Sequence, residues 1–306
     1  MASAFSGILA YGFFKTNGLG DLGTEWGQHY GTVEDPYTWV GVMEGIAGWR
    51  WIFIMQGIIT VVIGGIGVFT IVDFPENAAS GLSKGLSLPF LNQKEADFVV
   101  ARIERDRHDA IATPFSASEY AKCAADLKIW GFAALFGLTA TVAYAIAYFL
   151  PIILGDGMGF GVAAAQCLIA PPYVVAAIWM FGCAVLGDRL HLRGPFIIAN
   201  GVMGLIGLPL IGFSDNVGAR YFGVFLATTA VNANIPCILT FQANNIRGQW
   251  KRALASATLV GSGGIGGIIG STVFRSEDAP AYIPGIITCI IACGLVIVVT
   301  LMLEFK

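Results

Sequence analysis

A long run without charge is the feature that most limits how this chain can fold. No Asp, Glu, Lys or Arg lies between Arg50 and Asp73, and most side chains in that stretch are apolar. About 20 apolar residues cross a bilayer as a helix, so Trp49–Val72 has the length of one membrane span. Asp73 and Pro75 are predicted to end it, since one is charged and the other cannot continue a helix.

The same pattern recurs after the middle of the chain. Residues are 56% hydrophobic and 12% charged, whereas soluble domains are about 25% charged. Ala2–Phe14 is apolar but too short to span, and is predicted to be part of a helix. The sequence therefore predicts an all-α polytopic membrane protein with about seven full transmembrane helices and one partial helix. Six of these follow one another without an internal charged residue or histidine, at about Ile129–Leu154, Ala163–Leu186, Pro195–Phe213, Tyr221–Phe241, Leu254–Phe274 and Ile283–Leu303.

A polar connector, Glu76–Lys128, separates the first span from the other six. Within it, Asn92 and Glu95 have the spacing of a capping box, and the apolar residues that follow share one helical face. We predict a short amphipathic helix there, lying on the membrane surface or forming a solvated linker. The predicted organisation is residues 1–74, with a long non-cytoplasmic loop, a cytoplasmic connector at 75–128, and a six-helix unit at 129–306.

Positive charge is unequally divided between the two sides of these spans. Of the 17 Lys and Arg residues, thirteen fall on the side of the connector and four on the other. Cytoplasmic loops carry the excess of Lys and Arg, so we predict that the connector and the C-terminus are cytoplasmic. We expect the plasma membrane rather than an internal membrane.

Several motifs resemble those of one transporter family. They are Gly48–Ile54 with Asp73–Glu76, Phe98–Asp106, and Asn244–Ala253 with Gly266–Ser271 and Phe274–Tyr282. Together they resemble the fungal allantoate-permease-like transporters, in the anion:cation symporter branch of the major facilitator superfamily. The resemblance covers nearly all of the chain from Gly48 to Lys306.

The resemblance implies a plan of two six-helix halves joined by a cytoplasmic connector. The C-terminal half would be complete, giving a partial major facilitator fold, while the first four helices and part of the fifth are absent. We therefore expect an N-terminally truncated chain. Gly264 stands where the family usually has an Asn.

The implied function is transport of a small organic anion, a carboxylate such as allantoate, nicotinate or pantothenate. In the full-length form we expect proton-coupled symport by alternating access. Ionisable residues inside a membrane usually mark ion paths, and the six predicted spans hold none. We therefore expect this chain to be incomplete or inactive by itself. A non-transporting membrane scaffold or sensor remains an alternative.

An enzyme is not expected. The three histidines, His29, His108 and His191, lie in polar loops and form no nucleophile or metal constellation. We expect no cofactor or metal, with the proton as the candidate coupling ion. The expected partners are the lipid bilayer and the anion, and the chain is expected to be a monomer. A net charge of −3 does not favour nucleic acid.

Polar side chains within the spans are the candidates for substrate contact. Tyr144 and Tyr148 are four residues apart and share a face of a helix that lines the cavity in this family. Asn232 and Asn234 are two apart, so at most one is expected to face the cavity, and Asn232 is preferred. Hydrogen bonding to other helices is the alternative for each amide. The predicted substrate-binding residues are Tyr144, Tyr148, Gln166, Asn232 and Asn200.

Two further sets of residues are predicted to serve gating and helix packing. One loop resembles the superfamily's cytoplasmic gating motif, and its candidate gate residues are Asp188, Arg189 and Arg193. The alternative is that this loop is basic only because cytoplasmic loops carry an excess of Lys and Arg. A glycine-rich helix reads G-x-G-x-x-G, but no strand precedes it, so a dinucleotide site is not expected. Its glycines are predicted to let two helices approach closely, and they are Gly263, Gly266, Gly267 and Gly270.

Overall fold

The computed structural model describes residues 48–71, 92–107, 117–159, 161–278 and 282–304. All regular structure in these ranges is helical, and seven helices are long and apolar enough to cross a membrane. The predicted all-α polytopic class is therefore confirmed. The predicted partial helix at Ala2–Phe14 and the long loop after it lie outside the described residues. The chain divides into two units between Arg102 and Ile103, which are described separately.

The first unit holds α2 (Gly48–Thr70) and most of α4 (Gln93–Arg107). The 23 residues of α2 rise about 34 Å as an α-helix, which is sufficient for the hydrocarbon core of a bilayer. Its predicted stop at Asp73 and Pro75 lies outside the described residues. At the start of α4, the backbone N–H of Asn92 donates to Glu95 Oε2 at 2.9 Å, as a capping box requires.

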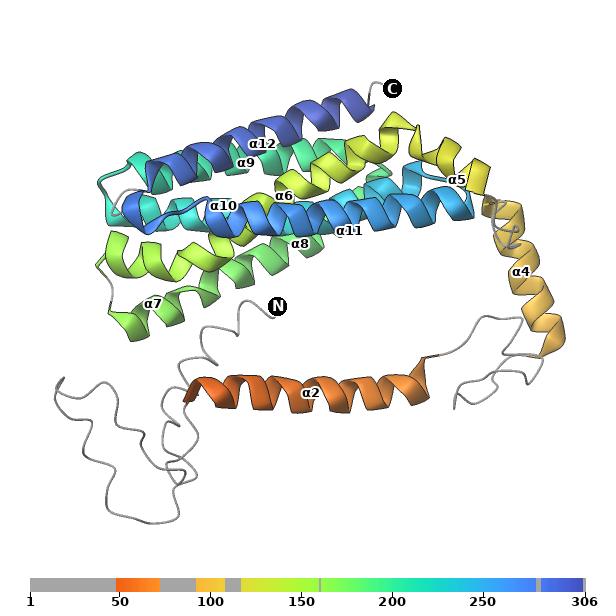
Figure 1. Cartoon of the computed structure of the whole chain (residues 1–306), viewed down its shortest axis with the longest axis horizontal. Helices are drawn as coiled ribbons and strands as arrows, with labels where there is room; N and C mark the ends of the chain where they lie inside the picture. The colour runs from red at the N-terminus through yellow and green to blue at the C-terminus, as the bar shows by residue number, and fades with distance from the viewer. Residues whose placement is uncertain (1–47, 72–91, 108–116, 160, 279–281, 305–306) are drawn as a thin grey trace, which may run out of the picture. The chain divides into compact units, whose positions relative to one another are not determined.

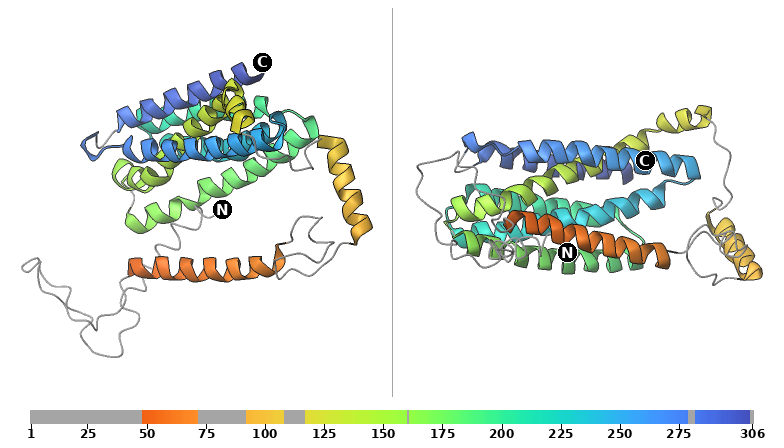
Figure 2. Two further views of the ribbon diagram at one scale, coloured as in Figure 1. Left: turned by 45° about the vertical axis from the view of Figure 1, so that its right-hand side comes forward. Right: turned by 60° about the horizontal axis from the view of Figure 1, so that its bottom comes forward.

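The second unit is a bundle of six spans that lie side by side (Figures 1 and 2). After the short α5 (Ala117–Ala124), α6 packs against α10, α11 and α12, while α10 also packs against α8 and α9. Each span agrees with its predicted range to within a few residues. Their bounds are α6 Leu127–Ile152, α7 Val162–Leu168 with α8 Ala170–Leu190, α9 Gly194–Phe213, α10 Val217–Asn245, α11 Gln249–Thr272 and α12 Ile283–Glu304.

Two spans are less regular than the sequence predicts. The span predicted at Ala163–Leu186 is divided, because α7 ends at Leu168 and α8 starts anew with Pro171 and Pro172 in its first turn. Proline is tolerated there because the first N–H groups of a helix have no intrahelical acceptor. At the end of α6, Pro151 is followed by one π-helical turn, Ile153–Gly157.

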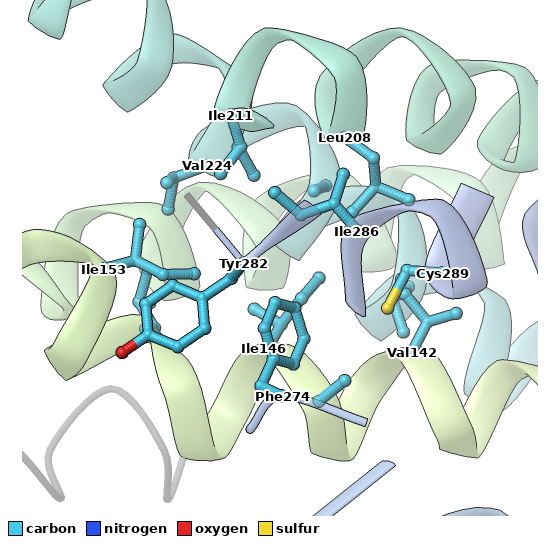
Figure 3. Packing of buried hydrophobic residues seen from close by; sticks show 14 of the residues in the cluster. Val142, Ile146, Ile153, Leu208, Ile211, Val224, Phe274, Tyr282, Ile286 and Cys289 are labelled. Carbon is cyan, nitrogen blue, oxygen red and sulfur yellow. The ribbon is translucent and has the colours of Figure 1, made fainter. Parts of the chain in front are cut away.

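Buried apolar side chains form two clusters, one toward each end of the bundle. The first lies where α6 ends and α12 begins, and includes Ile146, Phe274 and Ile286 (Figure 3). The second lies near the beginning of α6 and the end of α10, and includes Phe132 and Ile238. Since lipid is as apolar as these side chains, close packing rather than water exclusion holds the spans together.

Candidate functional site

Tyr144 and Tyr148 form a stacked aromatic pair on the outer surface of the six-helix unit. Their ring centroids are 5.9 Å apart at an interplanar angle of 22°, and the residues are 44% and 56% exposed. The pair lies at the seam between α6 and α11, because a Cβ added at Gly267 would be 3.2 Å from the Tyr144 ring. The arrangement offers a flat apolar surface together with two hydroxyl groups.

Asn200 lies in the interior instead of at this surface. It is 1% exposed on α9, and its Oδ1 accepts a hydrogen bond from Trp179 Nε1 of α8 at 2.9 Å. This hydrogen bond between α8 and α9 is the structural role predicted as the alternative to substrate contact for the intramembrane amides. The substrate role of Asn200 stays a prediction. Gln166 belongs to α7, and its side chain lies outside the described part of the chain.

The two amides of α10 have different surroundings, as their spacing requires. Asn232 is half-buried, and its Nδ2 donates to the carbonyl of Thr228 one turn earlier at 2.8 Å. Asn234 is 4% exposed, and among the described residues no group bonds to its Oδ1. The side-chain amide of Asn232 thus donates a hydrogen bond within its own helix, while the Oδ1 acceptor of Asn234 is buried inside the bundle.

A small cavity lies between the two apolar clusters. Thr139, Asn200 and Asn234 line it, together with Val142 of the first cluster and Val296 of the second. About 10 Å³ of it is open to a water-sized sphere, whereas pockets for small molecules measure about 300–1,000 Å³. This cavity, with three polar residues in a mostly apolar lining, is too small for a carboxylate substrate in this conformation. Thr139 was not among the predicted site residues, and Asn234 was considered but not preferred, although both are polar residues at membrane depth.

The predicted gate loop is shorter than expected, because Asp188 and Arg189 belong to the last turn of α8, and it contains one ion pair. The Arg193 guanidinium bonds to the Asp188 carboxylate and lies 3.5 Å from the carbonyl of Ala184, while Arg189 is exposed. Arg193 is 8% exposed and Asp188 is 72% exposed. The pair joins the end of α8 to the start of α9 within one six-helix unit. A gating role for these residues stays a prediction.

A second ion pair fixes the same end of the bundle. Asp126 caps α6 by accepting the backbone N–H of Lys128 at 3.0 Å, and its other oxygen pairs with Lys251 at the start of α11. The hydrogen bond from Lys251, followed by that from Lys128, lowers the pKa of the Asp126 carboxyl below its usual value. This pair could not be predicted from the sequence, because its partners belong to segments far apart in the chain.

The α11 glycines lie where α6 approaches most closely. A Cβ at Gly266 would overlap the carbonyl oxygen of Gly137, and one at Gly270 would overlap that of Thr141. At Gly264, in contrast, nothing lies within 4 Å of an added Cβ. Side chains are thus excluded on one face of α11 and tolerated on the other.

In the described ranges, no three His, Cys, Asp or Glu side chains come together in a group that could hold a metal ion. What these residues offer is recognition by aromatic rings, hydroxyls and amides.

Comparisons with known proteins agree with this description. The chain is 29% identical over 288 residues to the high-affinity nicotinic acid transporter of Saccharomyces cerevisiae, covering 94% of this chain and 47% of that protein. It is 30% identical over 308 residues to the major facilitator-type transporter hxnP of Emericella nidulans, covering 98% and 54%. The MFS-type transporter cnsO of Penicillium expansum is 28% identical over 291 residues, covering 92% and 50%. The chain spans about half the length of the curated relatives it matches.

The sequence profile of the Major Facilitator Superfamily matches residues 39–271, from α2 through most of α11. The match includes the connector as well as five of the six spans in the second unit. Because it covers well over half of its length, the chain belongs to the major facilitator superfamily of membrane transporters.

Proposed function

We propose that this chain serves the transmembrane movement of a small organic anion, a carboxylate of about the size of nicotinate. The observation that carries the proposal is the similarity to the high-affinity nicotinic acid transporter over 94% of the chain. The six-helix unit would be one of two halves that rock against each other in alternating access. Coupling to protons, as symport, is part of the proposal.

The aromatic pair supports a flat anionic substrate. The stacked Tyr144 and Tyr148 rings are large, rigid and exposed, so a planar acid can lie against them. Their hydroxyls can donate to a carboxylate, and hydrogen bonds to a charged group are stronger than neutral ones. Gly267 supports this arrangement, because a larger residue would push against the Tyr144 ring.

We also propose that the end of the bundle with the two ion pairs faces the cytoplasm. Lys128, Arg189, Arg193 and Lys251 gather at this end, where α6 and α11 begin and α8 ends. The positive-inside rule assigns such an end to the cytoplasm. The C-terminus, at the end of α12, would then be cytoplasmic, and the proposed location is the plasma membrane.

Binding to the purified chain tests the substrate class. Nicotinate is expected to raise the melting temperature, since a ligand that binds the folded state stabilises it. Nicotinamide, which has the same ring and no charge, is the matched control and is expected to have less effect. Equal shifts with both compounds, or none with nicotinate, pantothenate or allantoate, would refute anion recognition by this chain.

Two substitutions test the site itself. Tyr148→Phe removes the hydroxyl and keeps the ring, and should weaken nicotinate binding by roughly 10-fold, the value of a hydrogen bond to a charged group. Tyr148→Ala removes both and should weaken it further, by an added factor of about 2 to 10. Unchanged affinity in Tyr148→Ala would place the anion elsewhere. Uptake into vesicles with and without a proton gradient then tests the symport.

A further inference from the structure

The centre of the six-helix bundle holds a layer of buried polar groups between two apolar clusters. Thr139 of α6, Asn200 of α9 and Asn234 of α10 line one cavity there, and each is at most 4% exposed. The remaining lining is apolar, and includes Ala230 and Val296. Buried polar groups require partners, and empty cavities in proteins are normally lined by apolar groups alone.

The hydrogen bonds that these residues make determine which atoms remain available. Trp179 Nε1 can only donate, so its 2.9 Å bond identifies the bound atom of Asn200 as Oδ1. The Asn200 Nδ2 donor then makes no hydrogen bond of normal geometry among the described residues, although the Cys183 thiol, a weak acceptor, lies near it. The Asn234 Oδ1 acceptor has no partner in the same ranges. Thr139 donates its hydroxyl hydrogen to the carbonyl of Leu135 at 2.9 Å, which leaves its oxygen able to accept.

We propose that this cavity binds one water molecule, which accepts from Asn200 Nδ2 and donates to Asn234 Oδ1 and to Thr139. The open volume of about 10 Å³ is close to that of one water-sized sphere. Three polar partners match the usual number for a buried water. No charged side chain lines the cavity, so a bare cation would have no counter-charge.

The proposed water connects helices of the six-helix unit that pack around the cavity. Through Asn200 and its Trp179 bond it joins α9 and α8 to α10, and through Thr139 it reaches α6. The site is independent of the proposed substrate surface at Tyr144 and Tyr148, which lies on the exposed side of α6. The water would therefore be a fixed component of the six-helix unit rather than a transported species.

Two serine substitutions on α10 test the proposal. Ala230 and Ala227 are both buried, at 1% and 0% exposed, but only Ala230 lines the cavity. In Ala230→Ser the new hydroxyl can take the place of the water, so the melting temperature should stay close to that of the wild type. In Ala227→Ser the oxygen has no such space, and the melting temperature should fall by about 3–10 °C. Equal falls in the two variants would overturn the proposal.

A structure at a resolution that reveals ordered water gives the direct test. The expected result is a peak at about 2.7–3.2 Å from both Asn200 Nδ2 and Asn234 Oδ1. That peak should be absent from Ala230→Ser and retained in Ala227→Ser. A direct bond between the two amides, or a cavity without density in the wild type, would refute the assignment.

Discussion

The contact between Gly266 of α11 and the backbone of α6 makes a prediction that the structure can quantify. A methyl group at Gly266 would overlap the carbonyl oxygen of Gly137 and lie 3.1 Å from Ala140 Cβ. A backbone oxygen cannot rotate away as a side chain can, so the helices must separate. Gly264, on the same helix, has no atom within 4 Å of such a methyl and is the matched control.

The comparison between the two alanine variants isolates the steric cost. Gly→Ala in a helix gains up to about 1 kcal/mol of intrinsic helix stability at either position, so this gain cancels in the difference. Overpacking costs about 1–3 kcal/mol, and a backbone contact favours the upper half of that range, about 2–3 kcal/mol. At about 2–4 °C per kcal/mol, Gly266→Ala should melt about 4–12 °C below Gly264→Ala.

The cysteines of the protein provide the assay. Cys183, Cys237, Cys289 and Cys293 are buried, so a thiol-reactive fluorescent dye reports their exposure as the bundle unfolds. Both variants are measured in the same detergent at the same protein concentration. If they melt at the same temperature, the close approach of α6 and α11 does not limit which residues are tolerated at Gly266, and the reasoning is refuted.

Three other predictions concern the polar contacts. Arg193→Met should destabilise the six-helix unit by about 1–2 kcal/mol in thermal unfolding, since it removes the buried guanidinium and its charged hydrogen bond to Asp188. Arg189→Met should have little effect, because Arg189 is exposed. Asp126→Asn should lower the melting temperature at pH 7. Because the pKa of the Asp126 carboxyl is lower in the folded than in the unfolded protein, the stability that its ionised form contributes is present above the unfolded pKa and is lost as pH falls through the folded pKa. The melting temperatures of the wild type and the variant should therefore converge below about pH 4. Trp179→Phe leaves the buried Oδ1 of Asn200 without its donor and should cost about 1–3 kcal/mol. This is more than expected for Trp130→Phe, since the Trp130 indole donates to the Ala124 carbonyl in an exposed hydrogen bond.

The sequence predicted the spans well because membrane helices must satisfy a simple requirement. A helix of about 20 apolar residues is dictated by bilayer thickness, so charge-free runs locate α2 and the six spans of the second unit without tertiary information. The transporter class is also confirmed, since the chain belongs to the major facilitator superfamily and its relatives are described as transporters rather than enzymes. The finer assignment to the allantoate-permease-like branch stays a prediction.

The polar contacts were harder to predict, because each depends on the rotation of a helix about its own axis. The preference for Asn232 over Asn234 as the amide that faces the substrate cavity stays a prediction, and the periodicity of the mostly apolar α10 indicates no direction. The Asp126–Lys251 pair depends on the packing of α6 against α11, which pattern analysis does not specify. Pro151 was visible in the sequence, yet the π turn that follows it depends on how the end of α6 packs.

The two ends of α6 are held by different kinds of interaction. At its beginning, Asp126 caps the helix and pairs with Lys251. At its end, Pro151 cannot donate to the carbonyl one turn earlier, and a wider π turn begins at Ile153. That end is held by apolar packing instead, since Leu150 and Leu154 are buried in the first cluster. The surface around Tyr144 and Tyr148 therefore lies on a helix that is anchored by charge and capping at its beginning and by apolar contacts at its end.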